Sequence, residues 1–308
     1  MIVVAGEALI DLVPDRRGDA LSPLLPARGG GPFNTAIALS RLGSPTAFCS
    51  RISTDAFGES LVARLREEGV GLGLLQRGPE PTTLAVAALS ESGSADYTFY
   101  VDGTADRLFG PPPELPPATA AVSFGTCSLV LEPGASAYEE MMRTAAARGL
   151  VVALDPNIRA GLIPDPGAYR RRFAAWLPHV TLLKLSEEDA DWLGGDVTGW
   201  LAAGPAAVVI TRGGDGLTVT TRDGATRAVP GEPVRVVDTI GAGDTVNAAL
   251  LHGLAARGAL SPEAIAAMAP DDWGPLLSFA ARAAAVTCSR AGAEPPRASE
   301  LAGADPGA

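Results

Sequence analysis

The chain has 308 residues, of which 47% are hydrophobic, and carries a formal net charge of −11 at pH 7. This length and hydrophobic content allow one large α/β domain, whereas the acidic charge argues against nucleic acid or an anionic membrane as the main partner. With three scattered cysteines and two histidines, we expect buried free thiols and neither a multi-histidine metal site nor Ser-His or Cys-His catalysis. No basic segment precedes the first apolar run and no apolar stretch approaches about 20 residues, so we expect a soluble, cytoplasmic protein.

Apolar, β-rich runs alternate with Ala/Leu-rich helical runs along most of the chain. Strands are expected at residues 2–5, 121–124, 151–154, 180–185 and 207–211. Helices are expected at residues 33–42, 57–68, 137–148, 169–176, 245–257 and 276–289. Continuous apolar strands separated by helices predict a mostly parallel sheet that is covered on both faces.

Two segments depart from this alternation. Residues 9–25 are polar and rich in Pro and Gly, and residues 82–100 resemble a hairpin with its turn at residues 91–94. We expect one domain, residues 1–308, in which residues of about 9–28 and 82–104 form a small β-sheet. This sheet would be a lid over the site, a dimer surface or both, the alternative being ordinary surface decoration. The last seven residues, 302–308, are expected to fray.

The most distinctive motif is Asp-Thr-Ile-Gly-Ala-Gly-Asp at residues 238–244, followed by a small-residue helix. A glycine turn at a helix N-terminus points backbone N–H groups at an anion, and the helix dipole adds partial positive charge there. A carboxylate at this place suits phosphate transfer, in which an alcohol must lose its proton. The motif therefore predicts an anion hole at Gly241, Ala242 and Gly243 with a general base, Asp244. The alternative is a tight turn in which Asp244 binds first-turn amides.

Two further motifs suit a polyhydroxylated ligand. Three glycines at residues 29–31 let a ligand approach the backbone, and Asn34 offers both donors and acceptors. Asp11 follows the first strand and can accept two hydroxyl hydrogen bonds. The alternatives are a flexible turn capped by Asn34 and a solvated loop acid.

Three motifs at expected strand ends suit phosphate groups. Thr211 precedes a glycine-rich turn, Arg159 closes Asp-Pro-Asn-Ile-Arg, and Lys184 opens Lys-Leu-Ser-Glu-Glu-Asp. Arg159 could steady a transferring phosphoryl group, and Lys184 could meet nucleotide phosphates. The acids at residues 187–189 could hold water around Mg²⁺, the alternative being a solvated acid cluster at a helix N-terminus.

These motifs in this order resemble the ribokinase family, also called the PfkB carbohydrate kinases, from Gly6 to about Pro296. The resemblance implies an α/β fold, a ribokinase-like Rossmann-type sandwich with a small β lid, and ATP and Mg²⁺ as cofactors. It implies that Asp244 is the catalytic base, that residues 241–243 form the anion hole, and that Arg159 lies near the reacting centre.

The resemblance also assigns binding residues. The implied sugar contacts are Asp11, Gly30, Gly31, Asn34, Tyr100 and Asp244. The implied nucleotide contacts are Lys184, Ser186, Thr211, Gly213, Gly216 and Gly243. Asp189 is expected to contact Mg²⁺ through water.

The chain departs from the family pattern at three places. Ser186-x-x-Asp189 stands where the family often has Asn-x-x-Glu, which shortens the metal-water ligand. Residues 245–247, Thr-Val-Asn, replace the more usual Ala/Ser-Phe pair, which changes packing behind the site. Potassium-activated members use carbonyls near residues 238–240, but Glu-Pro-Pro follows Gly292-Ala293 here, so K⁺ is left open as a cofactor.

Within the family, the Gly-Glu pair at residues 6–7 and the Asp-Pro-Asn-x-Arg and Lys-x-Ser-Glu-Glu motifs look most like fructokinases and 2-keto-3-deoxygluconate kinases. The latter hold a carboxylate with a lid arginine near residues 100–101, and here residues 100–106 contain no arginine, the next one being Arg107. Fructose is therefore the expected substrate. A nucleoside kinase stacking its base on Phe99 and Tyr100, and a catalytically silent sensor, remain alternatives. The expected partners are a sugar, ATP and a second copy bound through the lid.

Overall fold

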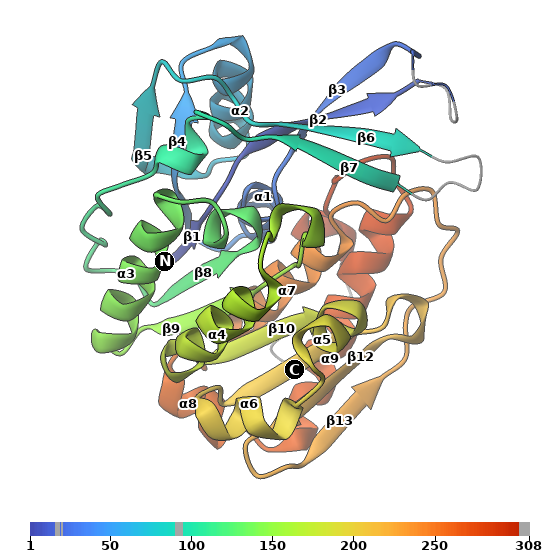
Figure 1. Cartoon of the computed structure of the whole chain (residues 1–308). Helices are drawn as coiled ribbons and strands as arrows, with labels where there is room; N and C mark the ends of the chain where they lie inside the picture. The colour runs from blue at the N-terminus through green and yellow to red at the C-terminus, as the bar shows by residue number, and fades with distance from the viewer. Residues whose placement is uncertain (16–18, 20, 90–94, 302–308) are drawn as a thin grey trace.

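The computed structural model of the chain describes residues 1–15, 19, 21–89 and 95–301. The expected turn at 91–94 and the expected frayed end at 302–308 lie outside this part of the chain. Within it, the strands form a nine-stranded sheet and a four-stranded sheet (Figure 1). None of the helices in the described residues is long and apolar enough to span a membrane.

The large sheet has the order β13-β12-β11-β10-β9-β8-β1-β4-β5. Its strands are β1 (Ile2–Ala5), β4 (Thr46–Ser53), β5 (Gly71–Gly78), β8 (Ala121–Gly125), β9 (Val151–Asp155), β10 (Leu182–Ser186), β11 (Ala207–Thr211), β12 (Leu217–Thr221) and β13 (Thr226–Val229). Neighbours pair in parallel from β5 to β11, and only β12 and β13 join antiparallel. Every residue of β1, β8 and β9 is buried, as expected for strands covered on both faces.

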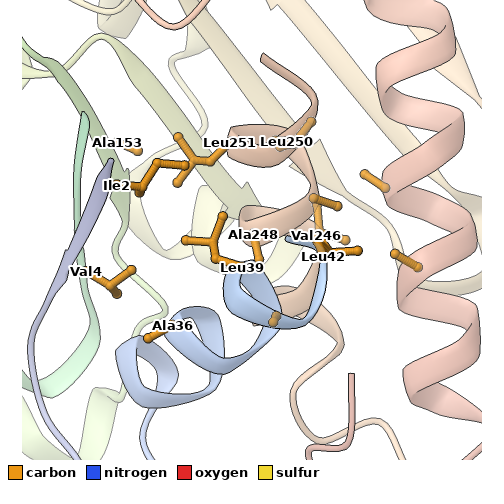
Figure 2. Packing of buried hydrophobic residues seen from close by; sticks show 14 of the residues in the cluster. Ile2, Val4, Ala36, Leu39, Leu42, Ala153, Val246, Ala248, Leu250 and Leu251 are labelled. Carbon is orange, nitrogen blue, oxygen red and sulfur yellow. The ribbon is translucent and has the colours of Figure 1, made fainter. Parts of the chain in front are cut away.

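Helices pack on both faces of the large sheet. One face carries α1 (Gly31–Arg41), α2 (Ala56–Glu67), α7 (Ala242–Ala256), α8 (Pro262–Ala267) and α9 (Pro270–Cys288). The other carries α3 (Gly134–Ala147), α4 (Pro166–Trp176), α5 (Glu187–Leu193) and α6 (Val197–Ala203). Figure 2 shows the first layer, in which Ile2 and Val4 of β1 face Leu39 of α1 and Leu251 of α7. Alternate residues of the same strand belong to the core of the other face.

The small sheet comes from the two segments that departed from the strand–helix alternation. Its order is β3-β2-β6-β7, with β2 (Leu9–Pro14), β3 (Leu24–Gly29), β6 (Leu84–Leu89) and β7 (Ala95–Tyr100). It stands off the main body beyond the end of β1 (Figure 1). The start of β6 is tied down because Asp55 accepts hydrogen bonds from the amide and hydroxyl of Thr82, and Asp106 accepts one from the hydroxyl of Thr83.

Several expected boundaries differ from the structure, most of all at α9, which begins at Pro270 and not at residue 276. The helix expected at 245–257 begins three residues earlier, at Ala242, because Gly241 adopts a left-handed conformation (φ 78°) and serves as the N-cap. Asp244 therefore lies inside the first helical turn. The strand expected at 180–185 begins at Leu182, because residues Leu177–His179 form a 3₁₀ turn.

Candidate active site

Two helices begin side by side at the carboxyl edge of the large sheet, and their first turns bring Asn34 and Asp244 together. The Asn34 side-chain amide donates to Asp244 Oδ2 at 2.9 Å, and the Thr35 hydroxyl donates to the Asp244 carbonyl at 3.4 Å. The glycine-rich segment that opens α1 and the glycine–aspartate motif that opens α7 thus form one site, although 210 positions separate Asn34 from Asp244.

Asp244 is 7% exposed, and burial raises the pKa of its carboxyl to about 6, while the hydrogen bond from Asn34 acts in the lowering direction. Its Oδ1 atom faces α1, where a Cβ on Gly31 would lie 3.1 Å away. One oxygen is therefore held by Asn34, and the other is directed at the glycines. At neutral pH this carboxylate is ionised and able to accept a proton.

The first turn of α7 offers amides to an anion. The N–H groups of Gly241 and Gly243 find no protein acceptor among the described residues, whereas the Ala242 N–H donates to the Thr239 carbonyl at 3.2 Å. Of the three residues predicted for the anion hole, two thus present unengaged amides. The structure uses the amide of Ala242 to close the turn.

Lys184 reaches this same turn from β10. Its ammonium donates to Asp155 Oδ2 at 2.8 Å, with both side chains buried, and lies 2.9 Å from the position of a Cβ on Gly243. A fixed positive charge thus adds to the helix dipole beside the unengaged amides. Asp155 was not among the predicted site residues, although it ends a predicted strand region and begins the motif that contains Arg159.

Asp11 and Arg159 interact electrostatically with each other. Burial raises the pKa of Asp11 on β2 to about 6, while the charge of Arg159 acts in the lowering direction. The Arg159 charge also lowers the pKa of Asp244, and its Nη1 atom is fixed by the Asn157 carbonyl and side chain at 3.1 and 2.7 Å. The predicted residues Asp11, Asn34, Arg159 and Asp244 therefore share one electrostatic environment.

The two predicted glycines of α1 allow a close approach. A Cβ on Gly30 would lie 2.7 Å from the Glu7 carbonyl, and one on Gly31 would lie 2.6 Å from the Thr126 methyl group. Thr126 (φ 61°) and Asn157 (φ 42°) both hold left-handed backbone conformations, which are strained for residues with a side chain. Such strain is typical of functional sites, and sequence reasoning missed both residues.

The family model described as "pfkB family carbohydrate kinase" matches residues 1–300. The chain belongs to this family. It is 40% identical over 277 residues to a fructokinase of Rhizobium leguminosarum bv. trifolii, covering 87% of this chain and 84% of the relative.

Solved structures agree with this family assignment. A fructokinase of Xylella fastidiosa with bound ATP matches with a TM-score of 0.89 and 27% identity, covering 98% of this chain and 97% of that one. A double-mutant fructokinase of Vibrio cholerae O395 with fructose, ADP and a potassium ion matches with a TM-score of 0.80 and 25% identity, covering 95% and 93%. The ribokinase-like fold expected from the sequence is thereby confirmed.

In this carbohydrate kinase, Tyr100 does not join the other predicted sugar contacts. Asp11 pairs with Ala85 and Ala85 with Phe99, whereas Tyr100 pairs with Leu84, one register position away. Because side chains alternate between the faces of a sheet, Tyr100 lies on the face opposite Asp11, and it is 60% exposed.

The residues of β7 that share the Asp11 face of the small sheet are those at odd-numbered positions. Phe99 and Tyr97 are two positions apart on β7 and therefore share the Asp11 face, with their ring centroids 6.1 Å apart. The charges of Asp11 and Arg159 also act on the Tyr97 hydroxyl, whose pKa is raised mainly by burial. Tyr97 is thus a residue of the small sheet near the site that the sequence prediction did not select.

The predicted nucleotide residues lie one strand further along the sheet. Thr211 pairs with Ser186, two positions beyond Lys184, and its hydroxyl donates to the Leu185 carbonyl at 3.4 Å. Gly213 lies in an exposed turn after β11. A Cβ on Gly216 would lie 2.1 Å from the Val229 carbonyl, so packing against β13 is sufficient reason for this glycine.

Ser186 and Asp189 form a capping box at the start of α5. The Ser186 hydroxyl accepts from the Asp189 amide at 3.0 Å, and Asp189 Oδ2 accepts from the Ser186 amide at 3.4 Å. Asp189 Oδ1 accepts from the Ile158 amide at 2.9 Å. Both oxygens of Asp189 therefore bind backbone amides, and its water-mediated contact with Mg²⁺ stays a prediction.

Proposed function

We propose that this chain transfers the γ-phosphoryl group of ATP to a primary hydroxyl of fructose. The observation that carries the proposal is the first turn of α7, where the buried carboxylate of Asp244 adjoins unengaged amides and the ammonium of Lys184. A base and an anion site in one helical turn suit an alcohol that loses its proton while phosphate charge develops beside it.

In the proposed reaction, the Asp244 carboxylate accepts the proton of the sugar hydroxyl as the new oxygen–phosphorus bond forms. The bond between the β–γ bridging oxygen and the γ-phosphorus breaks, and ADP leaves. The Gly241 and Gly243 amides, the α7 dipole and Lys184 stabilise the transferring group, with Arg159 nearby. A general base of this kind contributes about 10²–10⁴-fold in rate.

The relatives and the position of Arg107 favour a neutral ketose over a sugar acid as the substrate. The relatives reported above are fructokinases, and one of them binds fructose. Arg107 is the first arginine after β7. Its guanidinium donates hydrogen bonds to the Asp102 carboxylate at 2.7 Å and to the Glu132 carbonyl at 2.7 Å. It is therefore not free to clamp a substrate carboxylate, which supports fructose over 2-keto-3-deoxygluconate. Asp11, Asn34 and the glycine backbone would hold the hydroxyls.

Mg²⁺ fits this site as a partner of ATP rather than of a protein cage. The described residues contain no group of three or more His, Cys, Asp or Glu side chains that could hold a metal ion. Mg²⁺ keeps several waters and neutralises phosphate charge when bound to a nucleotide, so we propose that ATP oxygens and water supply its ligands. A K⁺ ion beside residues 238–240 is proposed from the potassium-bound relative.

The small sheet is proposed to act as the lid and as a homodimer surface. Leu21, Leu24 and Leu25, on and before β3, are 94%, 41% and 55% exposed. Apolar exposure of this kind suits contact with a second copy. Light scattering with size-exclusion chromatography would detect the dimer, and an Asp pair in place of Leu24 and Leu25 should give a monomer.

Free thiols at all three cysteines fit the proposed cytoplasmic location.

The test is ADP production with MgATP and fructose, 2-keto-3-deoxygluconate, ribose, adenosine or a phosphorylated ketose. Asp244→Asn should lower kcat by at least about 10²-fold with little change in ATP binding. Asp165→Asn, which keeps a capping acceptor at the distant N-terminus of α4, is the matched control. Because the base must be ionised, kcat of the native enzyme should fall as the pH drops through about 6. Normal turnover by Asp244→Asn would exclude the proposed base, and turnover of another substrate in preference to fructose would exclude fructose.

A further inference from the structure

A small cavity lies behind the proposed catalytic base, between α1, α7 and the ends of β1, β8 and β9. Its volume is about 10 Å³, which is room for one water molecule. Val4, Pro32 and Phe124 supply apolar walls. The polar side chains around it belong to Thr35, Ser123, Thr126, Asp155, Asp244 and Asn247.

Two residues of this lining each have a buried oxygen atom without a hydrogen-bond partner in the part of the chain that the structure describes. Asp155 Oδ1 is unpartnered although Oδ2 of the same carboxylate binds Lys184. Asn247 Oδ1 is unpartnered although its amide nitrogen donates to the Ser123 hydroxyl at 3.0 Å. Both side chains are more than 90% buried. An unpaired buried acceptor gives up the hydrogen bond that it would make to water, so two of them in residues around one cavity favour a shared donor.

We infer that the cavity binds one ordered water molecule, which donates one hydrogen bond to Asp155 and one to Asn247. Water has two hydrogens, two residues that line the cavity each carry one unpartnered acceptor, and the cavity has the volume of one water. A cation is a poorer occupant because the ammonium of Lys184 already binds the same carboxylate.

This water would make Asn247 a positioning residue for the phosphoryl transfer proposed above, on which the inference rests. Asn247 lies on α7 one turn beyond Gly243 and Asp244. Through the water it would orient Asp155, which holds the Lys184 ammonium against Gly243. Asn247 therefore acts on the anion turn and does not touch the sugar. Its loss should lower kcat and leave the KM for the sugar unchanged.

The first test is a crystal structure of the native protein in which ordered water is visible. We expect one water within hydrogen-bond distance of both Asp155 Oδ1 and Asn247 Oδ1. A structure in which either oxygen instead accepts from a protein group would overturn the inference. This result does not depend on catalysis, so it stands whether or not the chain phosphorylates fructose.

The second test compares three variants. Asn247→Leu keeps the volume but removes the acceptor, and we expect kcat to fall about tenfold at unchanged sugar KM, as for a small misplacement of a catalytic group. Ser123→Ala removes the direct bond to Asn247 and leaves both acceptors, so its loss should be smaller. Thr245→Val removes the buried 2.9 Å bond to Thr287 on the α9 side of α7 and should keep native kcat.

Native kcat in folded Asn247→Leu would overturn the positioning role. An equal loss in Ser123→Ala would do the same, because the direct bond would then explain the effect. If Asn247→Leu does not fold, the native crystal structure and Ser123→Ala decide the question.

Discussion

Glu7 has a buried carboxyl group, and its ionisation should lower the free energy of unfolding. It lies between β1 and β2 and is 2% exposed. One oxygen accepts from the Thr126 hydroxyl and the other from the Ser128 amide at 3.1 Å, and no salt bridge to it occurs among residues in the described ranges. Burial raises its pKa from the ordinary value of 4.5 to about 7, and the nearby charge of Asp106 adds to the effect.

The sign and size of the effect follow from proton linkage. Between pH 4.5 and about 7 the folded state keeps a proton that the unfolded chain releases, so the free energy of unfolding falls as the pH rises through this window. At about 1.4 kcal/mol per pKa unit, the difference between 4.5 and about 7 is worth about 3 kcal/mol above pH 7.

The perturbation is Glu7→Gln, which keeps the shape and the acceptor for the Ser128 amide but cannot ionise. Relative to the native chain, the variant should gain up to about 3 kcal/mol in unfolding free energy between pH 5 and pH 8. Urea unfolding followed by tryptophan fluorescence at several pH values measures this gain. Asp11 and Asp244 titrate in both proteins and cancel in the difference.

Glu67→Gln at an exposed position of α2 is the matched control and should show no comparable gain. A constant Glu7→Gln difference across this pH range would refute the reasoning, even if the variant were less stable throughout. A constant offset reports packing, whereas only a change with pH reports ionisation of Glu7.

Two further substitutions test the close contacts of the site. Gly31→Ala places a methyl group 2.6 Å from Thr126, so kcat/KM for the sugar should fall at least about tenfold, whereas Gly73→Ala in open space should not change it. Lys184→Met leaves Asp155 buried and unpaired and should cost about 3–5 kcal/mol in urea unfolding. Adding Asp155→Asn should recover stability but not ATP turnover, and recovery of both would contradict a role for the Lys184 charge.

The chemistry of α7 was predictable because it is local in sequence. Glycines followed by an aspartate at a helix start generate unengaged amides and a carboxylate within seven residues, 238–244. The partnership of Asn34 with Asp244 was not predictable from either motif, since it depends on α1 and α7 packing side by side. The amide of Asn34 and the carboxylate of Asp244 could each be predicted from a local motif, whereas their hydrogen bond depends on tertiary packing.

Local geometry bears on two of the predicted contacts, one in the small sheet and one at the start of α5. The resemblance implied Tyr100 as a sugar contact, but a shift of one residue moves a side chain to the other face of a sheet, and Tyr100 lies one register position away from the Asp11 face. The contacts assigned to Ser186 and Asp189 stay predictions, and the structure adds that Ser-x-x-Asp at this helix start forms a capping box.

Thr126 belongs to a different case, because no local pattern marks it, and the motifs that contain Glu7 and Asn157 do not reveal the burial of the one or the left-handed backbone of the other. The left-handed backbone of Thr126 and the burial of the ionisable carboxyl of Glu7 are each unfavourable alone. The hydrogen bond between them holds the Thr126 methyl group close to Gly31, and Asp244 Oδ1 lies close to the same glycine. Each unfavourable feature is held in place by residues distant in sequence, so it becomes visible only once the sheet has assembled. Stability given up at such positions is the expected accompaniment of a preorganised site.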